Sequence, residues 1–241
     1  MKKLTQAFLD SCPRDKGYIM RGEAMTRIET FVDAAFAFAF TMLIISVDEI
    51  PKSVSELFNT SRDIPAFLVS CAQIGAIWYA HSIFSRRYGL QDGRTVILSL
   101  CLVMLVLIFI YPLKLVFMGF FSWISGGYLS SGLSSMSQGQ LADLFVYFAL
   151  GLLSYAIISF LMLKNVLKQA DIIRLTSYER YACQTEVYYW LIYVFISLIS
   201  ILLAKTLNGM WVTLSGFIYF VIFIPAKILE KIRDKNKPAI E

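Results

Sequence analysis

The 241-residue chain has few charged residues for its length. Asp, Glu, Lys and Arg together make up 16% of it, whereas hydrophobic residues make up 58%, and the mean hydropathy is +0.66. Such a composition leaves too little polar surface to cover a water-soluble globule of this size. A soluble domain is therefore excluded.

Histidine and cysteine are also scarce, with one histidine and four cysteines in the whole chain. No CxxC pair is present, so we expect no disulfide framework and no metal site. Intramembrane proteases and transferases need paired acids, a Ser/His dyad or a His/Glu metal set, and neither HExxH nor GxSxG occurs. We therefore expect that the protein is not an enzyme and carries no cofactor.

What the chain does have is a series of apolar runs, each about 20 residues long, which matches the ~30 Å hydrocarbon core of a bilayer. The runs do not alternate in polarity as barrel strands do, so they predict helices. The expected fold is an all-α integral membrane protein in which residues 1–241 form one domain with six transmembrane helices. The expected spans are 27–47, 64–84, 95–117, 141–163, 186–205 and 210–229.

The basic residues predict the orientation of these spans. Eighteen of the 22 Lys and Arg residues lie in the N-terminal segment through Arg27, in the 86–94 and 164–180 connections, or in the tail from Lys227. Because basic residues concentrate on the cytoplasmic side, both termini are expected there: a short N-terminal segment (1–26) and a basic tail (230–241). The expected location is the inner (plasma) membrane. The basic residues are then expected to meet lipid headgroups, not nucleic acid.

The 118–140 connection carries no charge and is rich in Ser and Gly, which predicts a flexible loop on the outer side. Phe120, Phe121 and Trp123 in this stretch are expected at the membrane interface. Pro112 is expected to kink the third span or to mark its outer end.

The first span is unusually polar and aromatic for a membrane anchor. At 100° per residue, one stripe of this helix contains Phe31, Phe38, Thr41, Ile45 and Asp48. Phe at helical spacing is common in ordinary packing between helices. A stripe of apolar rings with one hydroxyl, followed by acidic Asp48 and Glu49, also fits a hydrophobic gate with a cation-attracting outer mouth.

Charged side chains inside a membrane are costly, at about 2.5–3.5 kcal/mol on insertion scales, and so mark structural or functional sites. Arg27 and Asp33 lie about 120° apart on the first span and cannot pair within it. His81, near the inner end of the second span, lies at a similar depth. We expect these three residues to form a network that holds the first span against the second, in preference to direct contact with a permeant ion.

The same region resembles the signature of a known family. The run Arg27-x-x-x-Phe31-Val32-Asp33 is similar to the RxxxFSD motif that opens the first helix of the transmembrane protein 175 family of potassium-permeable cation channels. The motif itself covers about fifteen residues, whereas the six-span layout covers the whole chain. Further matches of the same kind are Phe36, Ala37, Thr41, Leu43, Trp78, His81, Asp92 and Pro112.

The resemblance implies a homotetramer in which the first helix of each subunit lines a central pore for K⁺, without a P-loop filter. The family constriction falls on Phe38, with Thr41 and Ile45 further outward and Asp48 and Glu49 at the outer mouth. The inner structural network then comprises Arg27, Phe31, Asp33, Trp78, His81 and Asp92.

Two positions depart from the family pattern. Val32 replaces a serine and so removes a hydroxyl from the inner network. Phe38 stands where an Ile or Leu constriction is usual, and four phenyl rings facing one axis would close it more fully. The alternative is therefore a non-conducting membrane scaffold, or an effector subunit opened by a partner.

Overall fold

The computed structural model describes residues 3–45, 51–129, 137–207, 209–236 and 238. It contains six helical segments that are long and apolar enough to cross a membrane, which confirms the predicted fold class. The first five are α2 (Arg27–Ile45), α4 (Ile64–Tyr88), α5 (Gly93–Ile124), α6 (Gln138–Lys168) and α7 (Ser177–Thr206).

The sixth span is not one continuous α-helix. It alternates between 3₁₀ and α geometry before the final helix, in the order η2 (Gly209–Thr213), α8 (Leu214–Phe217), η3 (Ile218–Ile222) and α9 (Phe223–Asn236). The last helix runs past position 230, so the first half of the predicted basic tail is helical.

Short elements flank the spans. The N-terminal segment holds α1 (Gln6–Ser11) and an antiparallel pair of two-residue strands, β1 (Arg14–Asp15) and β2 (Tyr18–Ile19). The connection between the first two spans contains a further helix, α3 (Val54–Ser61). Its start is capped by Ser53, whose side chain accepts a hydrogen bond from the Glu56 amide.

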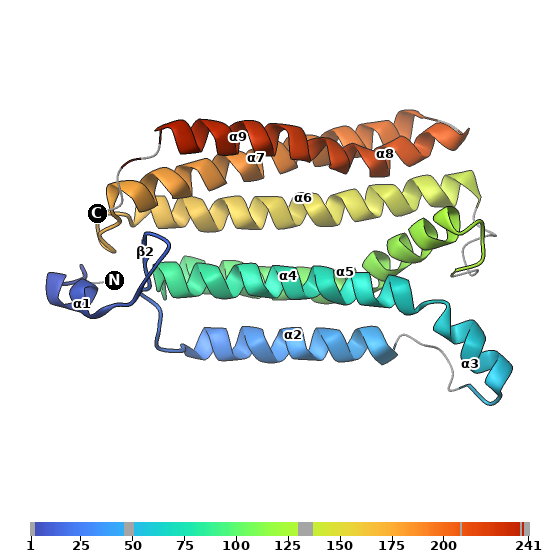
Figure 1. The fold of residues 1–241 in the computed structure, drawn as a ribbon, viewed down its shortest axis with the longest axis horizontal. Helices are drawn as coiled ribbons and strands as arrows, with labels where there is room; N and C mark the ends of the chain where they lie inside the picture. Colours follow the sequence, from blue (N-terminus) through green and yellow to red (C-terminus); the bar gives the residue numbers. More distant parts are fainter. Residues whose placement is uncertain (1–2, 46–50, 130–136, 208, 237, 239–241) are drawn as a thin grey trace.

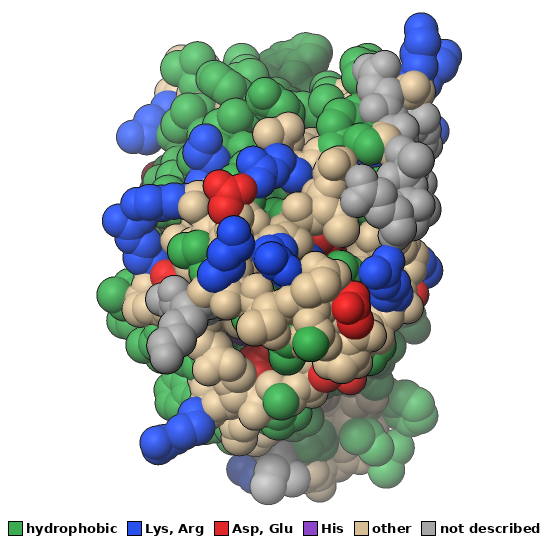
Figure 2. All heavy atoms as spheres, turned by 90° about the vertical axis from the view of Figure 1, so that its left-hand side faces the viewer, with side chains coloured by type: hydrophobic (Ala, Val, Ile, Leu, Met, Phe, Trp, Pro, Cys, Tyr) green, Lys and Arg blue, Asp and Glu red, His purple; other side chains and the backbone are tan. Residues whose placement is uncertain are grey.

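The helices lie roughly parallel in a bundle, and α2 forms one edge of it (Figure 1). Helices α2, α4 and α5 contact one another, α5 contacts α6, and α6 and α7 make the most extensive contact of the bundle. One end of the bundle, here called the terminal end, contains the N-terminal segment, the α4–α5 and α6–α7 connections and the end of α9 (left in Figure 1). Figure 2 looks onto this end, where Lys and Arg side chains are spread over the surface.

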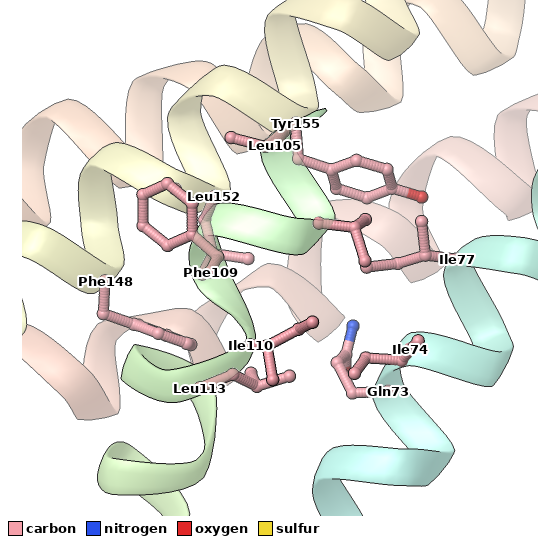
Figure 3. Close-up of a pocket in the computed structure, with 12 residues that line it drawn as sticks. Gln73, Ile74, Ile77, Leu105, Phe109, Ile110, Leu113, Phe148, Leu152 and Tyr155 are labelled. Atoms are coloured by element: carbon pink, nitrogen blue, oxygen red, sulfur yellow. The ribbon is translucent and has the colours of Figure 1, made fainter. Parts of the chain in front are cut away.

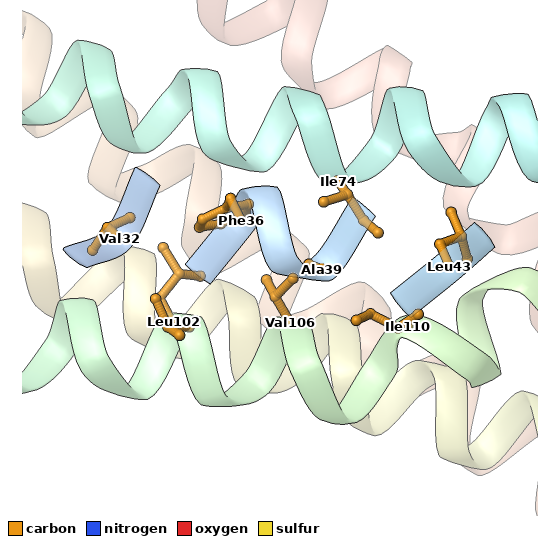
Figure 4. Close-up of a cluster of buried hydrophobic side chains, with 9 residues drawn as sticks. Val32, Phe36, Ala39, Leu43, Ile74, Leu102, Val106 and Ile110 are labelled. Carbon is orange, nitrogen blue, oxygen red and sulfur yellow. The ribbon is translucent and has the colours of Figure 1, made fainter. Parts of the chain in front are cut away.

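A tightly packed cluster joins α2 to its two neighbours. Val32, Phe36, Ala39 and Leu43 recur at steps of three and four, so they share one face of α2, and all are buried. They pack between Ile74 of α4 and a row of α5 residues (Figure 4). The α5 residues are Leu102, Val103, Val106 and Ile110. This cluster fixes which side of α2 faces the bundle.

Several helices extend beyond their predicted boundaries. Helix α4 continues to Tyr88 instead of ending at 84, and α7 begins at Ser177 instead of 186. Helix α5 passes through Pro112 and ends at Ile124, so the three aromatic residues predicted on the outer loop are helical. Its last turns tilt away from the rest of the helix (Figure 1), which matches the kink expected of a proline inside a helix.

Candidate functional site

The start of α2 is set by a reciprocal cap. The Thr26 hydroxyl accepts a hydrogen bond from the Glu29 amide (3.4 Å), and the Glu29 carboxylate accepts one from the Thr26 amide (2.6 Å). This arrangement satisfies two amides that the first turn of a helix leaves unpaired. The helix therefore begins at a defined residue, which fixes the rotation of every side chain after it.

The side of α2 that faces away from α4 and α5 is uncovered in the single chain. We call this side the open face of α2. Phe38 is 54% exposed there, whereas Phe36, two residues earlier, is 2% exposed. The face is apolar except for Arg27 at the start of the helix and the hydroxyl groups of Thr30 and Thr41. It consists of Arg27, Thr30, Phe31, Ala34, Ala37, Phe38, Thr41, Ile44 and Ile45.

The three candidate gate residues all lie on the open face. Phe38 and Ile45 are two turns apart, and Thr41 lies between them. The Thr41 hydroxyl donates a hydrogen bond to the Ala37 carbonyl (3.1 Å), so its oxygen keeps acceptor capacity toward the open side. The candidate outer-mouth residues Asp48 and Glu49 lie outside the described residues.

At the inner end, the candidate network divides into separate contacts. The Trp78 indole donates to the Asp33 carboxylate (2.8 Å), which joins α4 to α2. The His81 ring hydrogen-bonds with the Ser99 hydroxyl (3.0 Å), which joins α4 to α5. The structure gives Arg27 no hydrogen bond or ion pair with any described residue, and Phe31 is exposed. The expected direct contact among Arg27, Asp33 and His81 is therefore not formed within one chain.

Asp92, the last member of the candidate set, caps α5 and ties it to α6. Its carboxylate accepts hydrogen bonds from the Thr95 hydroxyl (2.7 Å), the Asn165 amide (3.1 Å) and the Arg94 backbone amide (3.2 Å). Partial burial acts to raise the pKa of this carboxyl, but the hydrogen bonds from Thr95, Gln169 and Asn165 outweigh it and hold the pKa below its ordinary value.

We expect the Asp92→Ala variant to lose about 0.5–2 kcal/mol of stability at neutral pH, the usual cost of removing a helix N-cap. Because the pKa is lowered in the folded chain, the stabilisation is complete above the ordinary value of 3.8 and is lost as the pH falls through the folded-state pKa. Thermal unfolding in detergent at several pH values measures this. A stability difference between wild type and variant that stays constant down to pH 3 would contradict it.

Sequence reasoning missed the most deeply buried charges in the described part of the chain. The Arg21 guanidinium meets the Glu179 carboxylate at the start of α7 in two hydrogen bonds of 2.7 and 2.6 Å, and their side chains are 1% and 0% exposed. Arg21 also donates to the carbonyls of Ile173 (2.8 Å) and Arg174 (3.0 Å). We call this cluster the Arg21 clamp.

The clamp draws the N-terminal segment against the end of α4. Gly22 and Gly89 allow the close approach, because a Cβ at Gly22 would lie 2.3 Å from the Ser85 carbonyl oxygen. Gly89 ends α4 in the left-handed conformation (φ 57°), where a side chain would be strained. The only local signal in the sequence was the capping pattern of Thr176 and Glu179, which predicts a helix start but not its partner.

Comparisons with known proteins give consistent results. A family model described as the endosomal/lysosomal potassium channel TMEM175 matches residues 27–112, which cover α2, α4 and the larger part of α5. A potassium channel from Marivirga tractuosa is 34% identical over an alignment of 223 positions, and the match covers 88% of each chain. The crystal structure of a variant of the potassium channel MtTMEM175, in complex with a nanobody–MBP fusion protein, superposes with a TM-score of 0.80 at 30% identity. That match covers 92% of this chain and 99% of the other.

Proposed function

Because the chain belongs to the TMEM175 family of potassium channels, we propose that it is a potassium-permeable cation channel that assembles as a homotetramer around the open face of α2. The observation that carries the proposal is the exposure of this face. A helix at the edge of the bundle, buried on one side by α4 and α5, leaves the side with Phe38 and Thr41 available to line a shared axis.

Each candidate residue has a role in this channel. Phe38 forms the narrowest ring, where an ion stripped of water finds no replacement ligands. Thr41 offers a hydroxyl just beyond it, and Ile45 forms a second apolar ring. Asp48 and Glu49 raise the local cation concentration at the outer mouth.

The inner residues have structural roles. Asp33 and Trp78 hold α2 against α4, while His81 and Asp92 hold α5 in place. Any preference for K⁺ over other cations comes from the constriction alone. This preference should be moderate. The concentration of basic residues at the terminal end supports the proposal that both termini are cytoplasmic and that the protein lies in the plasma membrane.

Oxidative cross-linking tests the tetramer. In a background whose four native cysteines are replaced by serine, Thr41→Cys should give disulfide-linked dimers on oxidation, because the Thr41 side chains of different subunits face one axis. Leu43→Cys, buried on the opposite side of α2, is the matched control and should remain monomeric on a denaturing gel.

Native mass spectrometry of the same samples should give the mass of four chains. A single-chain mass, or equal cross-linking at positions 41 and 43, would contradict the proposed axis. The scaffold interpretation would then be favoured, provided that liposomes containing the protein also show no potassium flux.

A further inference from the structure

A cavity away from the open face of α2 has no role in the proposed channel. It has a volume of about 310 Å³, which lies at the lower end of the ~300–1,000 Å³ range of ligand pockets. Its walls come from α4 and α5 on one side and from α6 and α7 on the other. Helices α4 and α7 face each other across it, with Ala80 and Ile83 on one rim and Tyr189 and Trp190 on the other.

The depth of the cavity matches one leaflet of a bilayer. Along α4 its lining extends from Ile77 to Tyr88, a rise of about 16 Å. Half of a ~30 Å hydrocarbon core is about 15 Å. The cavity is therefore about as long as one leaflet is deep.

The cavity is polar at one end and apolar at the other. Arg87 and Glu186 lie at the terminal end, with a guanidinium nitrogen 3.5 Å from a carboxylate oxygen. Toward the middle of the membrane, Ile77 and Tyr155 also line a second cavity of about 60 Å³, whose other walls are almost entirely apolar. Figure 3 shows side chains of α4, α5 and α6 pointing into that space. The two cavities share Ile77 and Tyr155 in their walls, and the lining changes from charged at the terminal end to apolar beyond these residues.

Two polar atoms at the terminal end lack partners. Tyr88 is 2% exposed, and neither its hydroxyl nor the Arg87 Nε has a hydrogen-bond partner in the described part of the chain. A buried hydroxyl without a partner is unfavourable, so a polar group that enters the cavity would be stabilised by a hydrogen bond with Tyr88. Both atoms lie beside the Arg87–Glu186 pair.

We propose that this cavity binds one phospholipid with a zwitterionic ethanolamine headgroup. One of the two acyl chains enters the apolar end of the cavity and the other stays in the surrounding lipid, while the phosphate lies against Arg87 and the Tyr88 hydroxyl and the ammonium group lies against Glu186. The adjacent opposite charges of the wall are complementary to the adjacent opposite charges of that headgroup. An anionic headgroup would leave Glu186 facing a phosphate without an intervening cation.

Native mass spectrometry with added lipid tests this. The detergent-solubilised, delipidated protein should bind one dioleoyl phosphatidylethanolamine per chain, at least tenfold more tightly than dioleoyl phosphatidylglycerol or oleate. Ala80→Trp should lower this affinity at least tenfold, because it fills the cavity mouth from an exposed position that can accept a large side chain. Ala76→Trp, one turn earlier on α4 and outside both cavity walls, should bind like wild type.

A further variant tests the headgroup. Glu186→Gln should remove the preference for ethanolamine over glycerol headgroups while still binding one phospholipid. Equal binding of both phospholipids by the wild type would overturn the proposal, as would equal binding by the two tryptophan variants. The readout is binding, so it is independent of potassium flux, and failure here would leave the channel proposal unchanged.

Discussion

Liposomes containing the Phe38→Ala protein are expected to take up potassium at least tenfold faster than those containing wild type. Phe38 is the largest side chain on the open face of α2 at mid-helix. Its replacement lets water enter the constriction and so lowers the barrier to a permeating ion. Lowering that barrier by only about 1.4 kcal/mol is enough for a tenfold increase in rate. Selectivity for K⁺ over Na⁺ should weaken at the same time.

The matched control for this experiment is Phe36→Leu. Phe36 is buried against α4 and α5 on the opposite side of the helix, so its replacement leaves the open face unchanged. Potassium uptake should then stay at the wild-type rate. If Phe38→Ala vesicles take up no more potassium than empty vesicles, the pore assignment is wrong and the scaffold interpretation should replace it.

The second large effect is expected at the Arg21 clamp. Glu179→Ala should destabilise the protein by about 3–5 kcal/mol, because it leaves a buried guanidinium without its counter-charge. The same change removes the acceptor of the Ile19 amide (2.8 Å) and of the Thr176 amide that caps α7 (2.9 Å). Thermal unfolding followed by size-exclusion chromatography in detergent measures the loss.

An exposed ion pair provides the comparison. Arg86 and Glu23 form a 3.1 Å contact in the same region, but their side chains are 57% and 47% exposed. Glu23→Ala should therefore change stability by at most about 1 kcal/mol. Similar losses in the two alanine variants would show that the clamp contributes no more than a surface pair.

The six spans could be predicted from the sequence because the thickness of the bilayer sets the length of a spanning helix. A run of apolar residues of that length is visible directly in the sequence. Apart from α5, whose added residues are mostly aromatic, the errors lie at the polar ends of helices. Helix α7 begins nine residues before its expected start because the segment from Ser177 is polar but helical, capped by Thr176 and packed on the N-terminal segment. Hydropathy locates the part of a helix that meets lipid and does not detect a part that extends beyond it.

The candidate site was predictable to a smaller degree. Phe residues occur on both sides of helix α2, so its sequence alone does not tell which side is buried, and the stripe of Phe38 also fitted ordinary packing. Burial of Phe36 and exposure of Phe38 in the structure assign the two sides. The contacts of Trp78 and His81 could not be paired from the sequence, because the partners Asp33 and Ser99 are on different helices.

The Arg21 clamp also has a consequence for biogenesis. Arg21 leaves the ribosome early, but Glu179 follows 158 residues later, about 8–30 s at translation rates of about 5–20 residues per second. The carbonyls of Ile173 and Arg174, which Arg21 also binds, are synthesised only shortly before Glu179. A chain truncated before the fifth span therefore lacks the carboxylate that neutralises the buried Arg21 guanidinium. Pairing of Arg21 with Glu179 thus distinguishes a chain that includes the start of the fifth span from one that ends before it.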